Sequence, residues 1–245
     1  MTGVISVYLS LVIAVAVGLV WAVLPFGGWL SGIFIGVLAM VATWIVIGRR
    51  LAKRIQPVLA QAQKQAEAGH AAMAITTVQS LLPTARWIPM LEGQLFAQIG
   101  VLSIGAGKED QAIEYLEKAT PRAAEGKLFL ACLYQRRRRA DDALRVLAEA
   151  QKRNGKHVLL HNVYAYLLYK ADDSAGAIEK LNALLAKVPE NEATKDNLSR
   201  VKNGKRMSMK PFGMHWYSLG LERPPASMNP QLHDPRRGFS GHARR

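Results

Sequence analysis

Two long apolar runs open the chain, and no charged residue interrupts them. Residues 4–24 and 29–48 consist almost entirely of apolar and small residues, and residues 1–48 contain no Asp, Glu, Lys, Arg or His. Each run has the length of a helix that crosses a bilayer, about 20 residues. Between them, residues 25–28 (Pro-Phe-Gly-Gly) have the composition of a turn. The pattern predicts a transmembrane helical hairpin over residues 1–50.

Basic residues directly after the second run set the expected orientation of this hairpin. Arg49, Arg50, Lys53 and Arg54 follow the run, whereas the expected turn carries no charge. The cytoplasmic flanks of membrane spans carry an excess of Lys and Arg. We therefore expect a multi-pass protein of a bacterial-type inner membrane, with both termini in the cytoplasm.

Small residues recur at every fourth position in both runs. They are Ser10, Ala14 and Gly18 in the first run and Gly28, Gly32 and Gly36 in the second. Small side chains let helix backbones approach closely in lipid. Two interpretations stay open: the two faces pack on each other within the hairpin, or one face docks on another membrane protein. A transport or proton-relay role is not expected, because no ionisable residue lies within the runs.

The region 51–203 repeats a small residue that is followed by larger apolar residues. The small residues are Ala74, Ala112, Ala143 and Ala177, at successive spacings of 38, 31 and 34 residues. A helical stretch and a turn signal precede each of them, and strand patterns are absent. Repeats of this length are typical of stacked helix pairs. The pattern therefore predicts an all-α fold.

The clearest unit lies between Glu92 and Pro121 and combines small and large residues in two helices. Its characteristic positions are Phe96, Ile99, Gly100, Gly107, Ala112, Leu116 and Ala119. These residues resemble the tetratricopeptide repeat (TPR), whose unit is two antiparallel helices in about 34 residues. The resemblance implies a TPR-like α-solenoid of three to four helix pairs within residues 51–203. A further amphipathic helix, over residues 190–202, would cap it.

In this family the first helices of the units form a concave groove for peptide partners. Carried over by alignment, the groove would contain Gln63, Val101, Leu128, Cys132, Gln135, Asn162, Tyr166 and Tyr169, with Arg136 and Lys170 at its rim. The Lys/Asn/Arg clamp that some members use for a C-terminal carboxylate is not matched. For the two tyrosines, packing against the capping helix is an equally good interpretation.

The net charge of +14 changes the expected partners only slightly. Residues 49–54 contribute four of these charges and the chain from Lys205 onward contributes six, which leaves about four on the helical region. We therefore expect protein partners and anionic lipid headgroups and do not expect nucleic acid. The run Arg136–Arg139 lies at an inter-helix turn, where either an anionic neighbour or solvation would offset its repulsion.

Residues 204–245 are rich in Pro, Gly, Lys and Arg, which predicts a basic, largely extended interaction tail. Its first half concentrates large side chains that need cover, namely Phe212, Trp216, Tyr217 and Leu219. The cover could be the chain's own groove, the membrane or a partner, and docking on protein is favoured. Because the helical fold would not depend on the tail, we expect it to survive removal of residues 205–245.

The sequence offers little catalytic chemistry. Cys132 is the single cysteine, which excludes an internal disulfide and a cysteine zinc site. His157 and His161 lie one helical turn apart, but no third ligand is near them in sequence. No enzyme, cofactor or metal is expected. The interpretation is a membrane-anchored TPR-like scaffold or adaptor that assembles an inner-membrane complex. The alternative is an integral accessory subunit of a membrane enzyme or energy-transducing complex.

Overall fold

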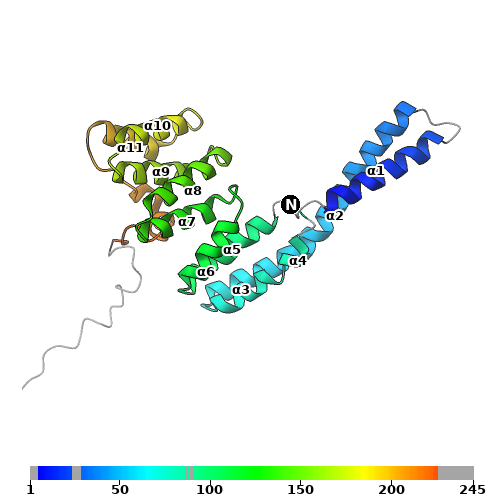
Figure 1. The fold of residues 1–245 in the computed structure, drawn as a ribbon, viewed down its shortest axis with the longest axis horizontal. Coiled ribbons are helices and arrows are strands. Elements are labelled where there is room, and N and C mark those ends of the chain that lie inside the picture. Colours follow the sequence, from blue (N-terminus) through cyan, green and yellow to red (C-terminus); the bar gives the residue numbers. More distant parts are fainter. Residues whose placement is uncertain (1–4, 24–28, 86–87, 89–90, 226–245) are drawn as a thin grey trace, which may run out of the picture.

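The computed structural model describes residues 5–23, 29–85, 88 and 91–225, and in these ranges it contains helices and no strand. The elements are α1 (Ile5–Val23), α2 (Trp29–Glu67), α3 (Ala71–Gln79), α4 (Leu82–Ala85), α5 (Leu91–Gly105), α6 (Glu109–Lys118), α7 (Ala124–Arg136), α8 (Ala140–Arg153), α9 (Val158–Lys170), α10 (Ser174–Leu185), α11 (Glu192–Lys202), the 3-10 turn η1 (Lys210–Phe212) and α12 (Gly213–Tyr217). The all-α prediction is confirmed for these residues. Figure 1 shows α1 and the first half of α2 extending away from the remaining helices.

Helix α2 runs without interruption past the boundary expected near residue 50. Its 39 residues correspond to about 58 Å of continuous helix. The stretch after Gly48 consists mostly of Arg, Leu, Ala, Lys and Gln, which favour helix. Pro57 lies inside the helix and does not end it. The apolar first half of α2 and its polar second half therefore form one rod.

One described helix is long and apolar enough to cross a membrane, and it is α2. The described part of the first run contributes a shorter apolar helix, Tyr8–Val23. The outer faces of both helices expose large apolar side chains, among them Leu30 at 86% and Val23 at 83%. Apolar surface on this scale is typical of a segment that does not face water.

Helix α1 packs along the apolar half of α2 through the small residues. A Cβ added to Gly18 would lie 2.9 Å from the carbonyl oxygen of Gly32, and one added to Gly36 would lie 2.9 Å from that of Ala14. Ser10 is buried in the same interface, while Gly28 lies outside the described residues. The two small-residue faces therefore pack on each other. This arrangement agrees with the interpretation in which the two apolar runs pair, and not with the one in which a face docks on another membrane protein.

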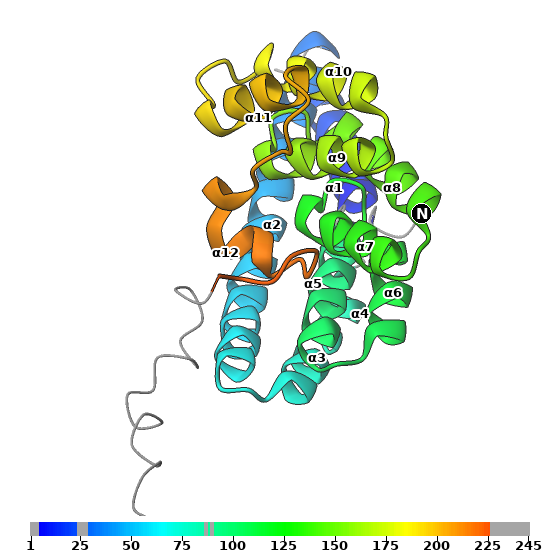
Figure 2. The same cartoon turned by 90° about the vertical axis from the view of Figure 1, so that its left-hand side faces the viewer.

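From the second half of α2 onward, neighbouring helices pack in sequential pairs: α2 with α3, α5 with α6, α7 with α8, and α9 with α10. Helix α11 then packs on α9 and α10. Figure 2 shows the helices from α5 to α11 following one another across the stack. The small residues Ala74, Ala112, Ala143 and Ala177 are all fully buried. Small side chains at these positions let paired helices approach closely.

The same turn closes the first helix of each pair. Gly69, Gly107, Arg138 and Asp172 have φ values of 81°, 74°, 60° and 61° and each precedes the buried alanine of its pair by five residues. In every case the residue after the left-handed one donates its backbone N–H to the carbonyl oxygen of the residue five positions before the donor, at 2.8–3.0 Å. This is the left-handed cap that ends many helices. The backbone conformation of the turn thus recurs at the same positions relative to the four buried alanines.

Three of the four arginines in the run at residues 136–139 form ion pairs within the chain. The ion pairs are Arg136–Glu109 at 2.5 Å, Arg137–Asp110 at 2.6 Å and Arg139–Asp142 at 2.6 Å. The acidic partners lie in the first turns of α6 and α8, where negative charge also complements the helix dipole. The anionic neighbour considered from the sequence is therefore intramolecular, and these arginines need no external phosphate.

Two hydrophobic clusters form the core. The first joins the second half of α2 to α3, α4 and α5, and the second extends from α6 through α11 to residues 207–221. Helix α5 belongs to both, because Leu95 and Ile99 lie in the first cluster while Val101 and Ile104 pack against the second.

A substitution at Gly100 tests the close contact between α5 and α6. A Cβ at this position would lie 2.5 Å from Cγ of Leu116, whereas a Cβ at Gly105 would meet nothing within 4 Å. We expect Gly100→Val to lower the free energy of unfolding by about 1–3 kcal/mol through overpacking. Thermal unfolding of the full chain in detergent, followed by circular dichroism, measures it. Gly105→Val is the control, and equal melting temperatures for the two variants would contradict the observed packing.

Candidate functional site

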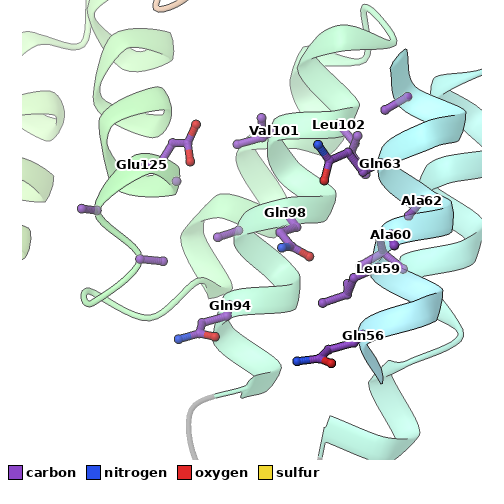
Figure 3. A pocket seen from close by; sticks show the side chains of 16 residues that line it. Gln56, Leu59, Ala60, Ala62, Gln63, Gln94, Gln98, Val101, Leu102 and Glu125 are labelled. Atoms are coloured by element: carbon purple, nitrogen blue, oxygen red, sulfur yellow. The ribbon is translucent and has the colours of Figure 1, made fainter. Parts of the chain in front are cut away.

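A groove of about 740 Å³ opens between the second half of α2, helix α5 and the start of α7 (Figure 3). We call it the open groove. Its lining residues are Gln56, Leu59, Ala60, Ala62, Gln63, Ala66, Val78, Gln94, Ala97, Gln98, Val101, Leu102, Ala123, Ala124, Glu125 and Gly126. It lies beside α5, where the two core clusters meet, so its floor is apolar and continuous with the core.

The floor is shaped by a close approach of two helices. A Cβ on Gly126 would lie 2.7 Å from Cβ of Ala97, so α7 touches α5 at this point. Leu59, Val101 and Leu102 supply larger apolar surface around the contact and are half-buried. An apolar floor of this kind suits side chains that project from one face of a peptide.

Four exposed glutamines surround the floor. Gln56 and Gln63 lie on α2, and Gln94 and Gln98 lie on α5 (Figure 3). Gln63 donates to Glu67 at 3.0 Å. Within the described residues the other three glutamines make no hydrogen bond. Each amide can donate and accept at once, so these side chains can pair with the backbone of a bound segment.

Glu125 is the single charged residue among those that line the open groove. No Lys or Arg of the described chain lines it, although the protein carries a net charge of +14. Binding of phosphates or nucleic acid depends on cationic side chains. The open groove therefore suits a ligand that is neutral or basic and partly apolar.

Only part of the groove expected from the sequence is open. Gln63 and Val101 line it, whereas Leu128 and Cys132 are each 1% exposed and belong to the second core cluster. Burial raises the pKa of the Cys132 thiol to about 12, so this cysteine is a packing residue. Gln135 is half-buried at the end of α7.

The remaining expected positions lie where the chain's own C-terminal segment, residues 205–225, packs. Tyr166 is buried with its ring edge-on to Trp216, at 4.9 Å between centroids. Tyr169 is half-buried against the second cluster, and the Nζ of Lys170 lies 5.0 Å from the Tyr166 ring centroid. The structure therefore does not bring these residues together with Gln63 in one open site.

Trp216 anchors the C-terminal segment and is fully buried. The carboxylate of Glu222 accepts hydrogen bonds from Nε1 of Trp216 and from the hydroxyl of Tyr166, each at 2.9 Å. Burial and this carboxylate raise the pKa of Tyr166, which keeps the phenol protonated as a donor. Tyr217 and Leu219 are also buried, and Phe212 is half-buried.

A buried polar network fixes the start of this segment, and sequence analysis did not identify it. The amide of Asn162 donates to Thr194 at 2.9 Å and its oxygen accepts from Asn197 at 3.1 Å. Asn197 in turn accepts from the backbone N–H of Ser208 at 2.7 Å. All three side chains are fully buried. They join α9, the capping helix α11 and the C-terminal segment through satisfied hydrogen bonds.

Residues 205–225 thus differ from the extended tail expected from composition. Their apolar side chains fill the second cluster, so their removal would expose the buried faces of α9 and break the polar network. From these contacts we expect removal of residues 205–225 to destabilise the helical region, in contrast to the expectation from composition. Residues 226–245 lie outside the described residues.

The two histidines considered as metal ligands have structural roles. Nδ1 of His157 accepts from the N–H of Leu160 at 3.2 Å and caps α9. His161 is fully buried, with Nε2 at 3.3 Å from the carbonyl oxygen of Asn154. Burial lowers the pKa of both rings. The described residues contain no group of three or more His, Cys, Asp or Glu side chains placed to hold a metal.

Comparison with known proteins adds no relative. No protein-family model matches the sequence, and a search of curated proteins gives no significant match.

Trp216 tests whether the C-terminal segment is part of the fold. Trp216→Ala should lower the free energy of unfolding by about 3–5 kcal/mol, because it removes a fully buried indole. Met214→Ala, three residues from the end of the same short helix and 57% exposed, is the control. Chemical denaturation of the full chain in detergent measures both. Equal midpoints would show that the segment is not docked.

Proposed function

We propose that this protein is a membrane-anchored TPR-like scaffold or adaptor that binds a protein segment in its open groove. Helix α1 and the apolar half of α2 form the anchor and cross the membrane as a hairpin, with both termini in the cytoplasm of a bacterial-type cell. The exposed apolar faces and the close packing through Gly18, Gly32 and Gly36 support this arrangement. Arg49 and Arg50, directly after the apolar half, support the orientation.

The observation that carries the proposal is the open groove itself. It combines an apolar floor, glutamine amides and one carboxylate, a chemistry that suits the binding of a peptide. The repeated turns and buried alanines support the TPR-like interpretation, because stacked helix pairs of that family present such grooves.

Anionic lipid headgroups are a second expected contact. Arg49, Arg50, Lys53 and Arg54 are exposed on one face of α2, whereas Ile55 on another face is buried in the first cluster. We call the four residues the basic face of α2. Because it points away from the helical core at the expected level of the membrane surface, it is free to contact anionic lipid.

The alternative, an integral accessory subunit of a membrane enzyme or energy-transducing complex, has less support. In such a subunit we would expect the small-residue faces to pack on partner helices. Those faces pack on each other, and the Cβ distances at Gly18 and Gly36 leave no room for a third helix between them.

Reporter fusions test the topology. A reporter that is active only in the periplasm should be inactive when fused after residue 245 and active when inserted within residues 25–28. The uncharged turn and the basic residues 49–54 are the reasons. Periplasmic activity at residue 245 would overturn the orientation.

Charge placed in the open groove should release the partner. We expect the double change Gln63→Arg and Gln98→Arg to reduce copurification of groove-dependent proteins by about tenfold or more, which corresponds to about 1.4 kcal/mol. The matched control is Gln61→Arg, since Gln61 is exposed on the same helix but does not line the groove. Quantitative mass spectrometry of detergent-solubilised complexes measures the difference. Equal copurification by the two variants would reject the groove as the binding site.

A further inference from the structure

The open groove has a fixed position relative to the expected membrane surface. Its α2 wall includes Gln56 and Gln63, which follow Arg49 by 7 and 14 residues in the same unbroken helix. At 1.5 Å per residue these side chains lie about 10 Å and about 21 Å along the helix from the membrane boundary. A segment bound between them therefore lies close to the lipid.

The part of the concave surface farther from α2 is already occupied. There the C-terminal segment buries Trp216 against Tyr166, and Asn197 holds its start. The opening that remains in the described part of the chain is bounded by α2, α5 and the start of α7. An incoming segment meets the open groove only next to the membrane-anchored helix.

The charges also restrict the occupant. Glu125 is the one charged residue that lines the groove, and the basic face of α2 lies nearby on the same helix. An acidic segment would be repelled by Glu125 and drawn to the basic face outside the groove. A segment with apolar side chains and one or more Lys or Arg fits the floor, the amides and Glu125 together.

The occupant must therefore lie close to the membrane, reach the groove beside α2, and carry both basic and apolar side chains. One class of sequence meets these three conditions. The cytoplasmic stretch directly beside a membrane span is typically basic, and it begins at the level of the lipid headgroups. We infer that the open groove binds the amphipathic juxtamembrane segment of an integral membrane partner. The inference rests on the proposed adaptor function and names the class of partner.

Site-specific photocrosslinking in intact membranes tests it with the full-length protein. A photoreactive side chain at Gln63 should give an adduct that the same side chain at Gln61 does not give. The adduct partner should remain in the membrane after alkaline carbonate extraction. Its crosslinked peptide should lie within about 20 residues of the cytoplasmic end of a span, the distance set by the helix rise.

Changes at Glu125 provide the second arm of the experiment. Glu125→Lys should lower the yield of the Gln63 adduct about fivefold or more, and Glu125→Gln should lower it less, because the carboxylate contacts a basic segment. Unchanged yield with Glu125→Lys would overturn the predicted basic character. Glu125 is exposed, so neither change disturbs the core.

The outcomes separate this inference from the adaptor function. No Gln63-specific adduct would overturn both. A Gln63-specific adduct with a protein that carbonate releases would leave the adaptor function standing and overturn the juxtamembrane partner. The same conclusion holds if the adduct is a second copy of this chain, or if it joins Gln63 to residues 226–245 of its own chain.

Discussion

The continuity of α2 is the constraint on which the arrangement of the molecule depends, and it persists although Pro57 has no N–H to donate within the helix. A helix end within α2 would leave four carbonyls and four N–H groups without helical partners. The helix formers that follow Gly48 allow the helix to continue for its 39 residues. The first half packs on α1 through glycine, and the second half packs on α3 and α5 through Ile55 and Ala62. The expected anchor and the helical region therefore share one rigid element and not a flexible linker.

The second feature is that the chain itself covers part of the groove expected from the sequence. Helix α9 is buried on all sides from Leu160 to Leu168, which requires cover on the face that a peptide would otherwise occupy. The C-terminal segment supplies this cover with methionines and aromatic rings. The polar atoms of Asn162 and Asn197 are paired, so the segment is specified by hydrogen bonds as well as by apolar burial. The surface next to α2 has no such cover among the described residues, and three of its four glutamines make no hydrogen bond there.

Sequence reasoning identified what depends on local periodicity and composition. The uncharged runs, the alanine spacing and the turn positions follow from nearest-neighbour chemistry, and the alanines lie in the buried positions that the alignment assigned to them. It did not identify the continuity of α2, because Lys and Arg after an apolar run signal a membrane boundary without ending a helix. It also missed Thr194, Asn197 and Ser208, whose roles depend on contacts between α9, α11 and a segment more than 30 residues away from α9 in sequence. All four turns, including the one at Arg136–Arg139, were predicted from the sequence. The left-handed φ of Arg138 was not, because arginine rarely takes such a φ.

The distribution of charge is the basis of the preference for a basic segment proposed for the groove. The arginines of the α7–α8 turn are paired with Glu109 and Asp110 of the preceding unit, so their charge serves to join neighbouring helix pairs. Each pair is at least one-third exposed and contributes less than about 1 kcal/mol, but together they leave little free positive potential on that side. Four exposed cations of α2 lie on its basic face, where a membrane surface would screen them, and Lys64 is exposed near the end of the same helix. The proposed preference for a basic segment therefore rests on Glu125, the one charged residue among those that line the open groove.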